Sequence, residues 1–125
     1  MSAQTIENVI AESQEAAPIC RSSDLLPGWG EAAWLEGRQI ALFRTEAGRF
    51  YAASHHCPSL GAKVMARGIL GDATIEGQRV DTIACPLHKE VYRLDTGICL
   101  NADTEALAVY EVTERDGWIW MEQGA

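Results

Sequence analysis

The chain has 125 residues, 47% of them apolar, and carries ten basic against eighteen acidic side chains, for a net charge of −8 at pH 7. This length suffices for one domain with its own hydrophobic core, and the acidic balance argues against a nucleic-acid-binding surface. No stretch approaches the about 18 uninterrupted apolar residues that a membrane helix requires, so we expect a soluble protein with no membrane contact.

The first 18 residues are polar and acidic and contain neither Lys nor Arg. They lack the basic start and the apolar stretch of a signal peptide. This predicts a cytoplasmic protein whose four cysteines stay reduced, which favours metal or catalytic use of those thiols. We expect residues 1–18 to form a flexible tail, or a short helix around Ile6 to Ala11, and residues 19–125 to form the folded domain.

From Ile19 onward, short apolar runs are separated by Gly, Asp and Asn, a texture typical of antiparallel β-structure. The expected strands in the first half are Ile19 to Arg21, Glu31 to Leu35, Gln39 to Arg44, Phe50 to Ser54 and Ala62 to Met65. Those in the second half are Val80 to Ala84, Val91 to Leu94, Leu107 to Thr113 and Trp118 to Glu122. The last two form a hairpin that an Asp-Gly turn closes, and Arg67 to Asp72 is a Gly-rich insertion.

Two short segments place a cysteine directly before a proline, Cys57-Pro58-Ser59 and Cys85-Pro86-Leu87-His88. Loops of this kind from two hairpins can bring soft and borderline ligands together at a metal. They resemble the loops of the Rieske family, in which Cys-x-His and Cys-x-x-His hold a [2Fe-2S] cluster through two thiolates on one iron and two imidazoles on the other. The resemblance implies an all-β, Rieske-like antiparallel sandwich or barrel, with Cys57 and Cys85 facing one another across two loop-bearing hairpins.

The ligand set for such a cluster is incomplete. Cys57, Cys85 and His88 match three ligand positions of the family. The fourth position, where the family has a histidine, is Ser59. A serine binds iron only as an alkoxide, and its side chain is shorter than imidazole. A [2Fe-2S] cluster is therefore either absent or held by an atypical fourth ligand.

His55 and His56 are the other imidazoles near the first loop, and they precede Cys57 instead of following it. Either one can replace the missing ligand only if the loop reverses its course. The same residues leave a second kind of site open, because two thiolates and two imidazoles satisfy tetrahedral zinc. That site would use Cys57, Cys85, His88 and one of His55 or His56.

A more specific resemblance runs through three segments, Val64 to Asp72, Cys85 to Lys89 and Tyr92 to Leu100. They resemble the small subunit of assimilatory NAD(P)H-dependent nitrite reductase, a Rieske-like family in which many members have lost cluster ligands. The resemblance covers Ile19 to Met121. It implies a large partner subunit that carries FAD, a [4Fe-4S] cluster and sirohaem and reduces nitrite to ammonia in nitrate and nitrite assimilation. This chain would support that reaction, not catalyse it alone.

Two alternatives stay open on the residues alone, an electron-transfer ferredoxin of an oxygenase with an intact [2Fe-2S] cluster and the zinc-binding module. Ser59 and the long connection formed by residues 60–84 favour the nitrite reductase subunit. Arg67 is expected either to hold its loop or to contact a partner subunit. An exposed tryptophan near the loops would be a candidate interface anchor, because tryptophan is enriched at interface hot spots.

Overall fold

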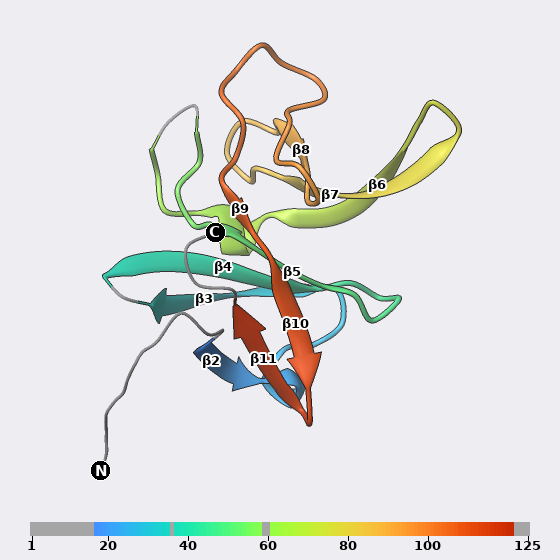
Figure 1. The fold of residues 1–125 in the computed structure, drawn as a ribbon. Helices are drawn as coiled ribbons and strands as arrows, with labels where there is room; N and C mark the ends of the chain where they lie inside the picture. Colours follow the sequence, from blue (N-terminus) through green and yellow to red (C-terminus); the bar gives the residue numbers. More distant parts are fainter. Residues whose placement is uncertain (1–16, 36, 59–60, 122–125) are drawn as a thin grey trace.

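The computed structural model describes residues 17–35, 37–58 and 61–121 and is built almost entirely of antiparallel strands (Figure 1). The strands of the first half are β2 (Ala17–Arg21), β3 (Trp29–Leu35), β4 (Arg38–Arg44) and β5 (Phe50–Ser54). Those of the second half are β6 (Ile69–Ile75), β7 (Gln78–Ala84), β8 (Val91–Arg93), β9 (Val109–Tyr110), β10 (Val112–Arg115) and β11 (Trp118–Met121). Two single 3-10 turns, η2 (Ser22–Asp24) and η3 (Met65–Arg67), complete the described elements.

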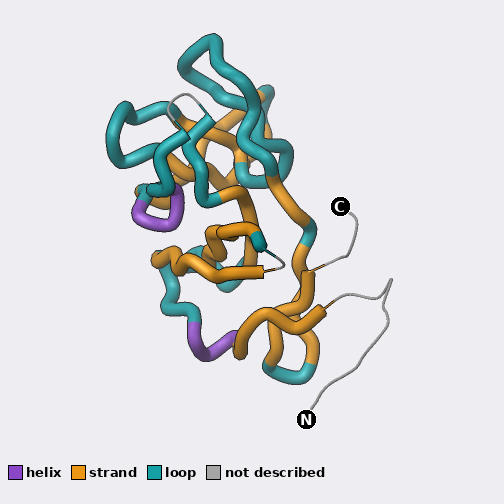
Figure 2. Tube along the Cα trace, turned by 90° about the vertical axis from the view of Figure 1, so that its left-hand side faces the viewer, coloured by secondary structure: helices purple, strands orange, loops and turns teal. Residues whose placement is uncertain are grey.

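The strands form three sheets with the orders β3-β4-β5-β9, β6-β7-β8 and β10-β11-β2. The four-stranded sheet lies between the other two, and the loops gather at the end of the molecule where β6, β7 and β8 are found (Figures 1 and 2). Within the described residues, the two helical segments are each three residues long, and neither is long and apolar enough to cross a membrane. The predicted all-β fold is confirmed.

Strand β4 separates two hydrophobic clusters, because successive side chains of a strand point to opposite faces. Ala41 and Phe43 belong to the cluster shared with the β6-β7-β8 sheet. Ile40 and Leu42 belong to the cluster shared with Ile119 of β11. Both faces of β4 are therefore covered, which explains why this strand reads as a continuous apolar run without polar alternation.

The connection between the two predicted loops differs from expectation. Ala62 to Met65, predicted as a strand, contains only an isolated bridge between Lys63 and His56 and then the first residue of η3. The Gly-rich insertion is itself extended and forms strand β6, which pairs with β7 over seven residue pairs. Glu76 and Gly77 close this hairpin with φ values of 50° and 82°, the left-handed pair that matches strand twist. A complete hairpin therefore precedes the second loop.

The predicted C-terminal hairpin is confirmed, with its turn at Asp116 and Gly117, but its first strand is divided. β9 pairs with β5, and β10 pairs with β11, so the chain changes sheet near Glu111. The first predicted strand is β2, and it pairs with β11. The predicted helix at residues 6–11, most of the predicted tail, and Glu122 lie outside the described residues.

Candidate metal centre

The two Cys-Pro loops share one backbone design. In each, the cysteine N–H donates to the carbonyl five residues later, at 2.8 Å for both Cys57 and Cys85. Each cysteine carbonyl accepts from the N–H four residues later, at 2.6 Å and 2.9 Å respectively. The residue at that fourth position has a positive φ in both loops, 75° at Gly61 and 65° at Lys89. The repeated Cys-Pro pattern thus specifies a repeated turn that ends each loop in the left-handed region.

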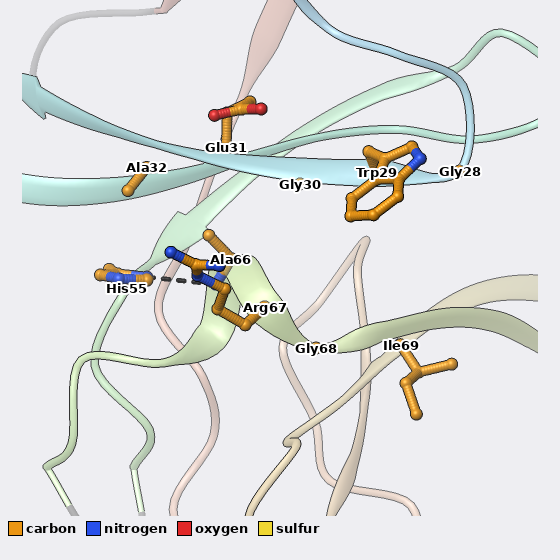
Figure 3. Close-up of a pocket in the computed structure, with 10 residues that line it drawn as sticks. All are labelled: Gly28, Trp29, Gly30, Glu31, Ala32, His55, Ala66, Arg67, Gly68 and Ile69. Atoms are coloured by element: carbon orange, nitrogen blue, oxygen red, sulfur yellow. Dashed lines mark hydrogen bonds between the residues drawn. The ribbon is translucent and has the colours of Figure 1, made fainter.

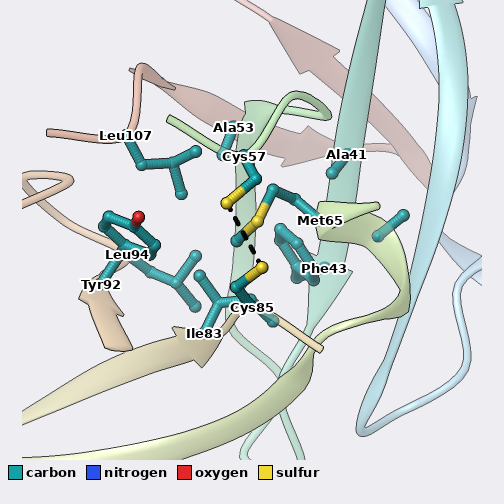
Figure 4. Close-up of a cluster of buried hydrophobic side chains, with 11 residues drawn as sticks. Ala41, Phe43, Ala53, Cys57, Met65, Ile83, Cys85, Tyr92, Leu94 and Leu107 are labelled. Atoms are coloured by element: carbon teal, nitrogen blue, oxygen red, sulfur yellow. Dashed lines mark hydrogen bonds between the residues drawn. The ribbon is translucent and has the colours of Figure 1, made fainter. Parts of the chain in front are cut away.

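The loops bring the two cysteines together, as predicted. Cys57 follows β5 and Cys85 follows β7, and the Cys85 thiol donates to the Cys57 sulfur with an Sγ–Sγ distance of 3.3 Å (Figure 4). Both residues are 0% exposed. Apolar side chains surround the pair, among them Phe43, Met65, Ile83, Leu94 and Leu107 (Figure 4). Two sulfurs at this separation can both bind one metal ion.

Burial controls the protonation of this pair. It raises the pKa of the Cys85 thiol, and the Cys57 sulfur beside it acts in the same direction. The backbone N–H groups of Leu87 and His88 point at the Cys85 sulfur and act in the opposite direction, because they stabilise a thiolate. Without a cation, Cys85 is therefore held as a thiol. A bound divalent metal would supply the positive charge that converts both groups to thiolates.

Among the described residues, no histidine joins the two sulfurs in a group whose donor atoms all lie within 4.8 Å of one another. His88 lies on the turn after Cys85, and its side chain is exposed. His55 is 7% exposed and faces η3, where its Nδ1 accepts the Ala66 N–H at 3.1 Å (Figure 3). Burial lowers the pKa of His55, which keeps the ring neutral and able to accept. His56 is exposed beside its bridge to Lys63, and Ser59 lies outside the described residues.

Glu90, which the sequence does not suggest as a ligand, lies beside the two cysteines. One carboxylate oxygen of Glu90 and the two sulfurs of Cys57 and Cys85 all lie within 4.8 Å of one another. Its Oε1 atom is buried and has no hydrogen-bond partner among the described residues. The length of the second loop could have indicated this position. The loop closes when the Cys85 N–H donates to the Glu90 carbonyl, which places the two residues opposite each other with their side chains on the same face.

Tyr92 closes the same space from the strand that leaves the second loop. It is fully buried in β8, two residues after Glu90 and therefore on the same face. Burial raises the pKa of its hydroxyl, and the nearby Cys57 sulfur and the Glu90 carboxylate act in the same direction. Two buried thiols, a half-buried carboxylate and a buried phenol thus lie close together.

The donor set matches only half of a Rieske-type [2Fe-2S] centre. The paired thiols of Cys57 and Cys85 fit the iron that takes two sulfur ligands. The second iron requires two imidazoles, and the chain has a serine, Ser59, at one of those positions. The orphaned Glu90 carboxylate adds an oxygen donor that the Rieske arrangement does not use. The residues therefore do not fit the complete cluster.

A groove of about 640 Å³ is lined in part by His55, which lies two residues before Cys57 (Figure 3). It lies between the start of β3 and the segment from η3 into β6, which includes part of the Gly-rich insertion. Trp29 and Ile69 border it and are 62% and 60% exposed. Arg67 is exposed within it, and Figure 3 shows its side chain rising from η3 towards β3.

The chain is similar to known proteins in both sequence and structure. Residues 16–122 match the family model described as a Rieske-like [2Fe-2S] domain. The small subunit of NADH nitrite reductase from Salmonella typhimurium is 33% identical over 104 residues, which cover 82% of this chain and 93% of that protein. The solution structure of the nitrite reductase [NAD(P)H] small subunit from Erwinia carotovora superposes with a TM-score of 0.71 at 33% identity, covering 91% of this chain and 85% of that one.

A third relative has a different chain organisation. The large subunit of nitrite reductase [NAD(P)H] from Klebsiella oxytoca is 35% identical over 103 residues, which cover 82% of this chain but only 10% of that protein. In that relative, a segment similar to most of this chain is one part of a much longer polypeptide.

Proposed function

The chain belongs to the Rieske-like [2Fe-2S] domain family and, within it, to the small subunits of NADH nitrite reductase, and from this we propose that it is the small subunit of an NAD(P)H-dependent nitrite reductase. Its partner is then the large subunit, which carries FAD, a [4Fe-4S] cluster and sirohaem and reduces nitrite to ammonia. We place the complex in the cytoplasm, where NAD(P)H is supplied. The match across almost all of the described chain carries this proposal.

The Klebsiella relative supports a direct association with the large subunit. There, the segment similar to this chain is covalently joined to the rest of a large subunit. A covalent connection keeps two modules at a high effective concentration. When the same module is a separate chain, a binding surface has to replace the connection. We therefore expect this chain to work through a stable complex, with a metal site that differs from a standard Rieske centre.

The groove beside the first loop is the face that we propose for this contact. It presents a largely exposed tryptophan, Trp29, beside the Arg67 guanidinium, and both residue types are enriched at interface hot spots. Ile69 extends the apolar border. Arg67 and Ile69 also belong to the Arg-Gly-Ile-x-Gly-Asp segment, where the resemblance to nitrite reductase small subunits is most specific.

The test is reconstitution with the purified large subunit. Nitrite-dependent NAD(P)H oxidation and the affinity of the complex are measured with the parent chain and with Trp29→Ala, Arg67→Ala and Trp34→Ala. Trp34 is the matched control, because it is 68% exposed on the same strand but lies outside the groove. Removing a hot-spot side chain costs roughly 2 kcal/mol or more, so we expect at least a 30-fold weaker Kd for Trp29→Ala.

Two results would contradict the proposal at different levels. If Trp34→Ala weakens binding as much as Trp29→Ala, the groove is not the docking face. If the parent chain neither binds the large subunit nor changes its nitrite-dependent oxidation of NAD(P)H, the assignment as its small subunit fails. A thermal melt of each variant checks that a loss of binding does not come from unfolding.

A further inference from the structure

The space between the two loops holds a buried polar atom that has no partner. Glu90 Oε1 makes no hydrogen bond to the described residues, and the buried Tyr92 hydroxyl has the Cys57 sulfur beside it. The sulfurs of Cys57 and Cys85 are 3.3 Å apart beside them. Glu90 as a whole is half-buried, but a buried carboxylate oxygen that lacks a partner is unfavourable, so such atoms are normally hydrogen-bonded or coordinate a metal.

The geometry matches a single tetrahedral ion. With zinc–sulfur bonds of about 2.3 Å and zinc–oxygen bonds of about 2.0–2.2 Å, tetrahedral ligands lie roughly 3.5–3.8 Å from one another. The Cys57 sulfur, the Cys85 sulfur and the Glu90 oxygen already lie within 4.8 Å of one another. The longest of these separations therefore exceeds the tetrahedral spacing by only about 1 Å.

We propose that Cys57, Cys85 and Glu90 form a buried site for one divalent cation of the zinc class, with a water molecule or the Tyr92 hydroxyl in the fourth position. The ion replaces the two thiol protons, which are released to solvent, and the carboxylate joins as the third ligand. No electrons are exchanged. The site then holds two thiolates, one carboxylate and a dication, for a net charge of −1, and the orphaned Glu90 oxygen is satisfied.

This site differs from both metal sites that the sequence suggests. In a [2Fe-2S] centre, the iron bound by two thiolates has its other two positions filled by sulfide, which leaves no role there for Glu90. In the zinc module predicted from sequence, His88 and one of His55 or His56 are ligands. In the structure His88 is exposed and His55 faces η3, whereas Glu90 lies beside both sulfurs.

The experiment uses the full chain, prepared metal-free with a chelator under reducing and anaerobic conditions. Cobalt(II) is titrated first, because thiolate-to-cobalt charge-transfer absorption reports sulfur ligation directly. Zinc is then titrated by calorimetry in buffers of different ionisation enthalpy, which count the released protons. We expect one ion per chain, cobalt–thiolate absorption, and displacement of cobalt by zinc.

Variants separate the three ligands from their neighbours. Cys57→Ser or Cys85→Ser should remove the charge-transfer band, and Glu90→Gln should weaken the Kd at least tenfold while keeping the side-chain shape. Cys99→Ser is the matched thiol control, since Cys99 is half-buried near Tyr92 but outside the group. Exposed Glu105 provides the carboxylate control as Glu105→Gln. His88→Ala should bind as the parent does.

Several outcomes would overturn the proposal. Two irons and two acid-labile sulfides per chain would show a cluster, and loss of binding in His88→Ala would show an imidazole ligand. Equal affinity of the parent and Glu90→Gln would remove the carboxylate from the site, and failure of the parent to bind either ion would remove the site altogether. Glu90→Gln without metal should melt no lower than the parent, because the Oε1 atom has no hydrogen bond to the described residues that the substitution could break. All measurements use the isolated chain, so they do not depend on the nitrite reductase assignment.

Discussion

The contact between Gly97, in the turn after β8, and Leu107 allows a test of how the core around the cysteines is packed. Gly97 and Gly117 both have a φ of 83°. A Cβ added at Gly117 would meet no atom within 4 Å, whereas a Cβ at Gly97 would overlap the Leu107 carbonyl oxygen. Replacing each by alanine therefore imposes the same backbone conformation but adds a steric conflict at only one site.

The magnitudes follow from the two sites. A left-handed conformation costs an alanine about 1 kcal/mol, which is the full expected effect of Gly117→Ala. Gly97→Ala must in addition displace Leu107, whose N–H donates to the Gly97 carbonyl at 2.8 Å. Losing that hydrogen bond costs about 1 kcal/mol, and partial exposure of the buried Leu107 side chain about 1–2 kcal/mol more. We expect a total loss of about 3–4 kcal/mol.

Urea unfolding followed by tryptophan fluorescence measures both variants, with the parent as reference. A loss of 3–4 kcal/mol is a large part of the roughly 5–15 kcal/mol that stabilises a typical domain. Leu107→Ala serves as a second probe of the same packing, with an expected loss of about 2–5 kcal/mol if Leu107 lies in the core. Equal losses for the two glycine variants would refute the placement of Leu107 against Gly97.

Two further predictions concern the buried carboxylate of Asp81. It accepts the Tyr51 hydroxyl at 2.7 Å and an Arg79 N–H at 2.9 Å, so Asp81→Asn should lower the free energy of unfolding by about 2 kcal/mol, measured by urea titration. Burial and this hydrogen bond raise the pKa of Tyr51 to about 12, from an ordinary value of about 10. The contribution of neutral Tyr51 is therefore complete below pH 10 and is lost as the pH rises to about 12. Between pH 10 and 12, the free energy of unfolding should therefore fall more steeply with pH for the parent than for Tyr51→Phe. The same dependence on pH in both proteins would count against the hydrogen bond between Tyr51 and Asp81.

The hairpins could be predicted because their signals are local. Asp116-Gly117 specifies a tight turn, because few residues adopt the left-handed conformations that such a turn requires. The short spacing between β3 and β4 likewise indicates a turn, and the apolar runs on either side of each turn indicate strands. The sequence does not predict strand β6, because Gly71 within it and Gly68 directly before it weaken the strand signal. It becomes a strand only through seven-residue pairing with β7.

The candidate site shows the same division. The sequence by itself identified Cys57 and Cys85 and their meeting, because two Cys-Pro turns of one design point to a shared metal position. Only the tertiary structure decided what lies beside them: it leaves His88 exposed, turns His55 towards Ala66 and brings Glu90 and Tyr92 close to the sulfurs. Turn conformation depends on a few consecutive residues, whereas ligand convergence depends on the pairing register and packing of segments that are far apart in the chain.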